Sequence, residues 1–179
     1  MLGGNVLELS KHEAAPSAGG EYAGIGSRFL ASLIDGIILG VPMYLISTVF
    51  ASLMLMGDAD FMTMLEKDNN YVTEPEIFAV FFSLLKITAI IGAFALLVYF
   101  LYYTLMESSK WQATLGKKIM GIHVADAEGG RISFGQAAGR FLARSFLSPI
   151  LMIGYILAFF TERKQALHDL LAGTIVLKK

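Results

Sequence analysis

The 179-residue sequence has no cysteine, and only 16% of its residues are charged. The absence of cysteine excludes disulfides, thiolate nucleophiles and cysteine-ligated zinc or iron–sulfur sites. A soluble domain carries about a quarter charged residues, so the low charge argues against a water-exposed globule. Fourteen Lys and Arg against fifteen Asp and Glu leave a net charge of −1, which argues against a nucleic-acid-binding surface. With 55% hydrophobic residues, the composition indicates a small membrane protein.

The apolar residues are concentrated in three runs. Residues 29–57 contain a single charge, Asp35, and residues 77–106 contain a single charge, Lys86. Each run exceeds the roughly 20 residues that cross a bilayer core as a helix, so each predicts a transmembrane helix. The third run, residues 145–161, is shorter than the other two and includes a proline, which disfavours a straight helix. The third run is therefore either a kinked span or a re-entrant segment.

Charge placement predicts the orientation of these runs. Residues 1–21 have no apolar run typical of a signal peptide and predict a flexible cytoplasmic tail before a membrane domain over residues 22–179. The connection 58–76 holds one Lys and no Arg, whereas the connection 107–144 holds six Lys and Arg. By the positive-inside rule, the basic connection and the N-terminus are cytoplasmic.

The side of the C-terminal tail is open at this stage. A third full span would export the tail, although residues 162–179 carry four cations. Short β-branched runs at 118–125 and 174–177, with a turn at 126–130, predict a small β element. If the two runs pair, both lie on one side of the membrane.

An amphipathic helix is predicted between Ser133 and Arg144. Ser133 and Gln136 form a capping-box pattern at its start. Gln136, Arg140 and Arg144 make a polar stripe with four-residue spacing. The pattern is typical of a helix that lies along the membrane surface with its arginines toward lipid phosphates.

Asp35 and Lys86 lie inside apolar runs, where a charge costs about 2.5–3.5 kcal/mol on insertion scales. Arg28 precedes Asp35 by nearly two helical turns, so the two side chains share a helix face. If the two helices are antiparallel neighbours, Lys86 can reach Asp35; if the second span begins near Ile87, Lys86 lies nearer the outer interface. Two interpretations stay open: a charge pair that only fixes helix packing, and a site coupled to an ion or proton.

Three stretches, in order along the chain, resemble the RDD family of prokaryotic membrane proteins. The opening stretch is EYAGIGSRFLASLID at 21–35, and the closing stretch is QALHDLLAGT at 165–174. Between them lie TLGKK at 114–118, GIHVAD at 121–126, GG at 129–130 and SFG at 133–135. The resemblance covers residues 22–177 and implies a multi-pass protein of the prokaryotic inner membrane. Sodium/proton antiport has been attributed to some members of this family.

The resemblance also implies which charges matter. Arg28, Asp35 and Asp169 fall on the residues for which the family is named, and Glu107 falls where members often carry an acid. Lys86 does not belong to the family pattern. The basic loop motif contributes Gly116, Lys117 and Lys118.

The predicted fold is an all-α membrane protein with two transmembrane helices, a third kinked segment and a small cytoplasmic β element. No nucleophile with a neighbouring base and no metal-ligand spacing occurs, so the sequence predicts neither an enzyme nor a cofactor or metal site. Because three helices rarely enclose a solute path, a homo-oligomer or a larger membrane complex is expected. The bilayer is the expected partner, and nucleic acid is not.

Two functions are compatible with the sequence. The first is transport of an ion or small solute, with Asp35, Lys86 and Glu107 as candidate intramembrane charges and with Arg28 and Asp169 as a cytoplasmic gate. The alternative is a non-transporting membrane scaffold that binds a partner through its basic loop and its C-terminal tail.

Overall fold

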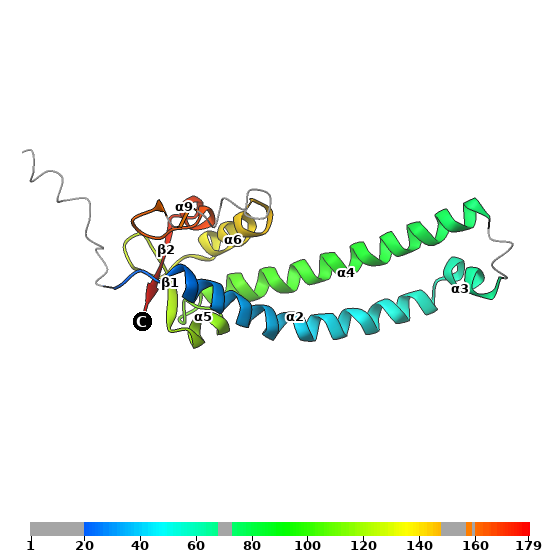
Figure 1. Ribbon diagram of the computed structural model, residues 1–179, viewed down its shortest axis with the longest axis horizontal. Helices are drawn as coiled ribbons and strands as arrows, with labels where there is room; N and C mark the ends of the chain where they lie inside the picture. Colours follow the sequence, from blue (N-terminus) through cyan, green and yellow to red (C-terminus); the bar gives the residue numbers. More distant parts are fainter. Residues whose placement is uncertain (1–19, 68–72, 148–156, 159) are drawn as a thin grey trace, which may run out of the picture. The chain divides into compact units, whose positions relative to one another are not determined.

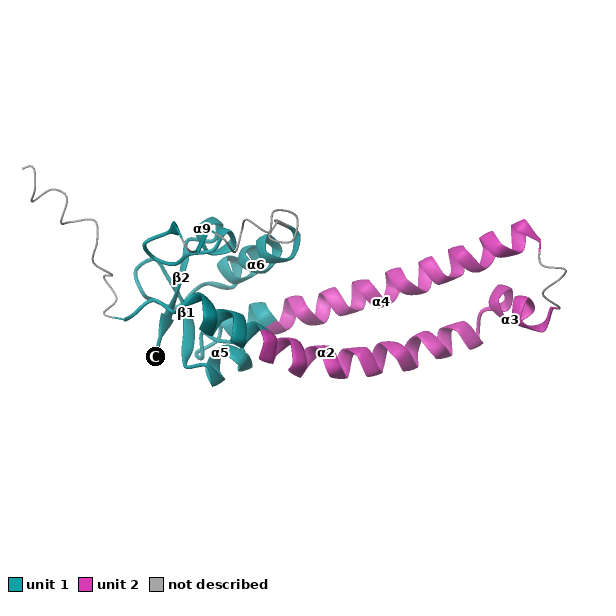
Figure 2. Cartoon of the chain, viewed as in Figure 1, with its two compact units in different colours: residues 1–32, 103–179 teal, residues 33–102 magenta. Residues whose placement is uncertain are grey.

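A computed structural model describes the chain over residues 20–67, 73–147, 157–158 and 160–179. The chain divides into two compact units, which Figure 2 colours separately. Unit 1 comprises Met1–Ser32 and Tyr103–Lys179, and unit 2 comprises Leu33–Tyr102. Residues 1–19 of the predicted tail, and 148–156 and 159 of the predicted third segment, lie outside the described residues. Both predictions therefore stay predictions.

Two long helices dominate the chain: α2 (Ile25–Met56) and α4 (Glu74–Ser108), shown in Figure 1. Their most apolar windows have mean hydropathies of 2.0 and 2.3, and only 6% of each window is buried. At 1.5 Å per residue the helices are about 48 Å and 52 Å long, more than the roughly 30 Å hydrocarbon core. The described part of the chain thus holds two helices that are long and apolar enough to cross a membrane, in the two places predicted.

In unit 2 the two helices run antiparallel. Tyr102 near the end of α4 bonds to Asp35 near the start of α2, and a Cβ built at Gly40 would lie 3.8 Å from the hydroxyl of Tyr99. The connection after α2 contains a helix that the sequence analysis missed, α3 (Ala59–Glu66). Asp58 caps this helix by accepting the backbone N–H of Phe61 at 3.1 Å.

Unit 1 contains the predicted β element. Strand β1 (Ile122–Asp126) pairs antiparallel with β2 (Thr174–Lys178), so residues of the basic connection and of the C-terminal tail share one sheet. The predicted strand start at residue 118 was wrong, because Lys118 lies in a short helix, α5 (Leu115–Ile119). Gly121 adopts φ +64° between α5 and β1, a conformation that glycine enters at little cost.

The beginning of the described chain lies along β2. The backbone N–H of Ala23 donates to Val176 O at 2.8 Å, and the N–H of Lys178 donates to Glu21 O at 2.8 Å. A buried core of Ala23, Ala31, Ile122, Val124, Ile132, Ala137 and Val176 packs beside them. The sheet therefore joins the opening motif, the basic loop and the tail into one unit.

Two further helices complete unit 1. Helix α6 (Phe134–Leu142) begins with the predicted capping box, since Ser133 and Gln136 bond reciprocally, and continues as a π-helical turn, η2 (Ala143–Leu147). Helix α9 (Leu167–Leu171) ends before Gly173, whose φ of +61° turns the chain into β2.

Candidate functional site

Arg28 and Asp169, two of the charges identified from the family resemblance, form an ion pair in unit 1. Arg28 Nη1, from the first turns of α2, donates to Asp169 Oδ2 at 2.6 Å. Asp169 is fully buried, and its Oδ2 also accepts the backbone N–H of Ala166 at 3.2 Å. Burial opposes ionisation of this carboxyl, but the charges of Arg140 and Arg28 lower its pKa to about 2. Asp169 is therefore a permanent anion at neutral pH.

Arg140 links Asp169 to Glu107. Its Nη2 lies 2.7 Å from Asp169 Oδ1, and its Nη1 lies 3.6 Å from Glu107 Oε2. Only 6% of the Arg140 side chain is exposed. The expectation that Arg140 points outward to lipid phosphates was wrong. Two buried carboxylates draw its guanidinium inward, because an unpaired buried anion costs far more than a surface contact returns.

Lys117, from the basic loop motif, also points inward and forms an ion pair with Glu107. Burial and the neighbouring charges of Arg140 and Arg144 lower the pKa of Lys117 to about 8, although Glu107 opposes the shift. The next residue behaves differently. Lys118 is exposed, and its Nζ lies 3.6 Å above the ring of Trp111. Gly116 is buried beside Lys117 at the start of α5.

Arg144 and His168 were not singled out as site residues, yet both lie in the same region. Arg144 Nη2 donates to Ser32 Oγ at 3.1 Å, and its guanidinium lies 4.8 Å from the centre of the Tyr103 ring. His168 Nε2 lies 3.5 Å from Asp169 Oδ1. Burial and the repulsion of Arg140, Arg144 and Lys117 lower the pKa of His168 to about 3, so this imidazole is neutral at pH 7.

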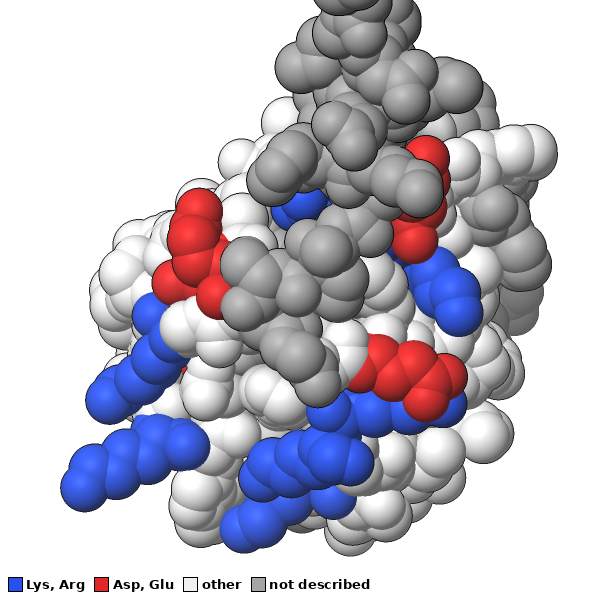
Figure 3. Space-filling model, turned by 90° about the vertical axis from the view of Figure 1, so that its left-hand side faces the viewer, with Lys and Arg blue, Asp and Glu red and all other residues white. Residues whose placement is uncertain are grey.

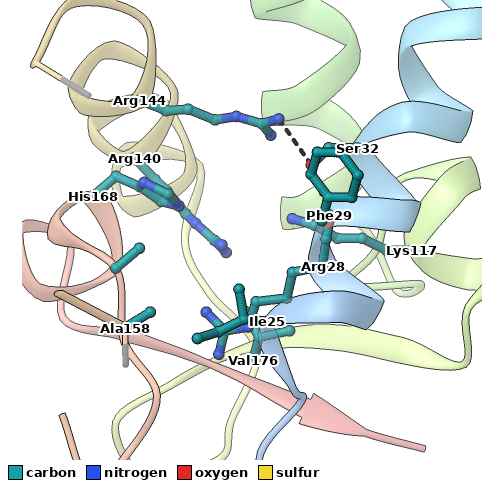
Figure 4. Close-up of a pocket in the computed structure, with 11 residues that line it drawn as sticks. Ile25, Arg28, Phe29, Ser32, Lys117, Arg140, Arg144, Ala158, His168 and Val176 are labelled. Carbon is teal, nitrogen blue, oxygen red and sulfur yellow. Dashed lines mark hydrogen bonds between the residues drawn. The ribbon is translucent and has the colours of Figure 1, made fainter. Parts of the chain in front are cut away.

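These contacts define a charge cluster in unit 1. It consists of four cations and two carboxylates: Arg28, Lys117, Arg140, Arg144, Glu107 and Asp169. A cavity of about 430 Å³ opens beside it, and all four cations line that cavity (Figure 4). Sequence reasoning could have found Arg140 and His168 only through their contacts with Asp169, which depend on the tertiary fold.

Unit 2 contains a different kind of charged group. Asp35 is 1% exposed in α2, and Tyr102 Oη donates to its Oδ1 at 2.7 Å. Lys86 lies 3.7 Å from Asp58 Oδ2, and its side chain is 60% exposed. Lys86 thus forms its ion pair with the acid that caps α3, and not with Asp35, the first of the two placements considered. The three candidate intramembrane charges have different partners. Asp35 contacts Tyr102, Lys86 contacts Asp58, and Glu107 belongs to the charge cluster.

Among the residues that the structure describes, no group of three or more His, Asp or Glu side chains is placed to hold a metal ion. The polar groups of unit 1 are instead arranged as alternating cations and anions. Such an arrangement fixes the side chains in place.

Two apolar helices of membrane-spanning length and a small α/β unit built on buried ion pairs define a helical membrane-type protein. The RDD family profile matches residues 22–173, and the chain belongs to the RDD family. One curated relative, the uncharacterized protein YxaI of Bacillus subtilis (strain 168), is 38% identical over 157 residues. That alignment covers 88% of this chain and 97% of the relative. No solved structure matches the chain.

Proposed function

We propose that this RDD protein is transport-related, and that Asp35 is the carboxylate that takes up a proton or a monovalent cation. The burial of Asp35 in the apolar helix α2 carries the proposal. A charged side chain at such a position costs about 2.5–3.5 kcal/mol, and intramembrane acids commonly mark ion and proton pathways. The hydrogen bond from Tyr102 Oη orients the carboxylate. It also places beside the carboxylate a hydroxyl that can pass on a proton.

The transport proposal requires more than one chain. Two apolar helices do not enclose a solute path by themselves, and large apolar side chains are exposed along both α2 and α4. Lipid and further copies of the chain are the partners that such a surface fits. The proposal therefore includes a homo-oligomer in the bilayer, without enzymatic activity and without nucleic acid.

The proposed location is the prokaryotic inner membrane, with unit 1 and the N-terminus on the cytoplasmic side. Among its described residues, unit 1 exposes seven Lys and Arg against three Glu, and Figure 3 shows such side chains on one face. This basic excess favours the cytoplasm. Because β1 and β2 share one sheet, the basic connection and the tail lie on the same side.

A scaffold role is the second candidate. The charge cluster supports it, because Arg28 and Asp169 are held by several partners at once and fix the fold of unit 1. In this alternative the exposed basic surface of unit 1 binds a partner, and the protein moves no solute.

Proton flux into liposomes distinguishes the two functions. The purified full chain is reconstituted, a sodium or potassium gradient is imposed, and the internal pH is followed with a trapped dye. Transport predicts cation-driven proton flux that Asp35→Asn abolishes, because the amide keeps the size of the side chain but cannot titrate. Asp60→Asn, in the exposed acid of α3, is the matched control and keeps the flux. Absence of flux in the wild type with every monovalent cation favours the scaffold.

A further inference from the structure

The charge cluster of unit 1 carries an excess of positive charge toward the cavity. Its four cations all line the cavity, whereas its two carboxylates, Glu107 and Asp169, do not. The cluster therefore carries two more cations than carboxylates, and Lys117, Arg140 and both acids are buried. Cations gathered at low dielectric repel one another. An anion in the cavity would offset this repulsion.

Several guanidinium donors in the cluster have no acceptor. Within the described part of the chain, Arg28 Nε, Arg28 Nη2 and Arg140 Nη1 are buried and make no hydrogen bond. Arg140 Nη1 lies 3.6 Å from Glu107, which is an ion pair beyond hydrogen-bond length. Figure 4 shows the guanidinium groups of Arg28 and Arg140 directed toward one another across the same space. Buried donors of this kind call for an acceptor with several oxygens, and phosphate is the anion that paired arginines bind best.

Apart from Ser32 and His168, the rest of the cavity wall is apolar. Ile25 and Phe29 of α2 and Val176 of β2 contribute to it, together with alanine side chains. Its volume of about 430 Å³ falls within the range of roughly 300–1,000 Å³ typical of small-molecule sites and leaves room beyond a single anion. A ligand that matches both parts of the wall has an anionic head and an apolar body.

The position of the cavity along α2 favours a lipid as the source of that anion. Ile25, Arg28, Phe29 and Ser32 occupy the first two turns of a helix long enough to extend beyond the hydrocarbon core. Phe29, at the cavity, is 67% exposed. Headgroups of lipids lie at the level where a spanning helix leaves the core, and basic pockets at that level bind anionic headgroups.

We propose that this cavity binds the phosphate group of an anionic phospholipid, with Arg28, Arg140, Arg144 and Lys117 as its cationic ligands. Arg144 is the residue to vary, because it lines the cavity and its known contacts are with Ser32 Oγ and the ring of Tyr103. Arg28 and Arg140 support the fold through Asp169, so their loss would confuse binding with folding.

Native mass spectrometry of the full chain in mild detergent tests the proposal. The protein is titrated in parallel with phosphatidylglycerol, with zwitterionic phosphatidylcholine and with soluble glycerol phosphate. The proposal predicts that each chain retains one phosphatidylglycerol tightly and retains phosphatidylcholine more weakly. Arg144→Gln weakens phosphatidylglycerol binding about fivefold or more, and Arg144→Lys restores part of it. Arg163→Gln, which removes one exposed cation of unit 1, is the matched control and leaves binding unchanged.

Three results would overturn the proposal. Equal retention of the anionic and zwitterionic lipids would show that no phosphate site selects charge. If Arg144→Gln and Arg163→Gln weaken phosphatidylglycerol binding equally, the lipid is attracted to the basic surface in general and not to the cavity. Glycerol phosphate bound as tightly as phosphatidylglycerol would assign the cavity to a soluble phosphate ester. If Arg144→Gln does not fold, the Arg144→Lys variant and the thermal stabilisation of the wild type by each lipid decide the same question.

Discussion

Unit 1 holds a cluster of ion pairs, whereas the described part of unit 2 holds one buried carboxylate, Asp35, within an apolar helix pair. In unit 1 each carboxylate has at least two cationic neighbours, and the low pKa of Asp169 reflects them. In unit 2 Asp35 accepts a hydrogen bond from the neutral hydroxyl of Tyr102. The difference indicates that the ion pairs of unit 1 serve stability, and Asp35 is the residue to vary in a test of the proposed transport.

Asp169→Asn is expected to have the largest effect on stability. The substitution leaves Arg28 and Arg140 beside a neutral amide, and breaking a buried pair by removing one partner costs about 3–5 kcal/mol. Denaturant unfolding in detergent micelles measures the loss. Asp60→Asn, at an exposed acid, is the control and is expected to change the free energy of unfolding by less than about 0.5 kcal/mol. Equal stability of the two variants would contradict a structural role for the cluster.

Glu107→Gln is expected to cost less, about 1.5–3 kcal/mol, because Arg140 keeps its contact with Asp169. Lys117 is then left as a buried cation without its carboxylate. The double variant Glu107→Gln/Lys117→Met removes both charges of the pair and is expected to recover part of the loss. The same unfolding measurement tests this. Strictly additive losses in the double variant would show that the two side chains are not coupled.

Acid is expected to destabilise unit 1 through His168. Its folded-state pKa, about 3, is below the usual value of 6.5 because the side chain is buried next to Arg140, Arg144 and Lys117. Between those two values the unfolded chain binds a proton that the folded chain does not, so stability falls as pH falls through this window. Asp169 adds a further loss below its ordinary pKa of 3.8, toward about 2.

The variant His168→Gln isolates this contribution. It should flatten the decline of the unfolding free energy with falling pH above about pH 4, the region that Asp169 does not yet affect. His123, whose pKa is also lowered by burial, remains in both proteins and serves as an internal reference. An identical pH profile for the variant and the wild type would refute the assignment to His168.

Lys86→Gln is expected to have the smallest effect. The Lys86 side chain is 60% exposed and lies 3.7 Å from Asp58, and exposed pairs of this kind contribute about 0–1 kcal/mol. Stability in micelles and proton flux in liposomes should both stay close to the wild type. A loss of flux as large as that of Asp35→Asn would mean that Lys86 works with Asp35 after all.

Much of this architecture could be predicted from local patterns. Hydropathy located α2 and α4, β-branched runs located β1 and β2, and the capping box at Ser133 located α6. These signals are local because a bilayer-length apolar run and a helix cap are properties of consecutive residues. The strand boundary at Ile122 was missed because Thr114 caps a short helix, α5, that the β-branched run conceals.

The site was less accessible to sequence reasoning. The resemblance to the RDD family marked Arg28 and Asp169, and the structure brings them together. Arg140 was assigned to the helix surface because amphipathic spacing does not distinguish a stripe that faces lipid from one that faces buried carboxylates. Lys86 and Asp35 were considered as partners because depth in the membrane was the available guide, whereas Lys86 pairs with Asp58.

Infrared difference spectroscopy of the reconstituted protein tests the central claim most directly, because it records which carboxyl groups change protonation or ion occupancy. On addition of sodium or a step in pH, we predict a carboxyl band that responds in the wild type. The band should persist in Asp60→Asn and disappear in Asp35→Asn. A responding band that survives in Asp35→Asn, or no responding carboxyl at all, would contradict the proposal that Asp35 is the carboxylate that takes up the proton or cation.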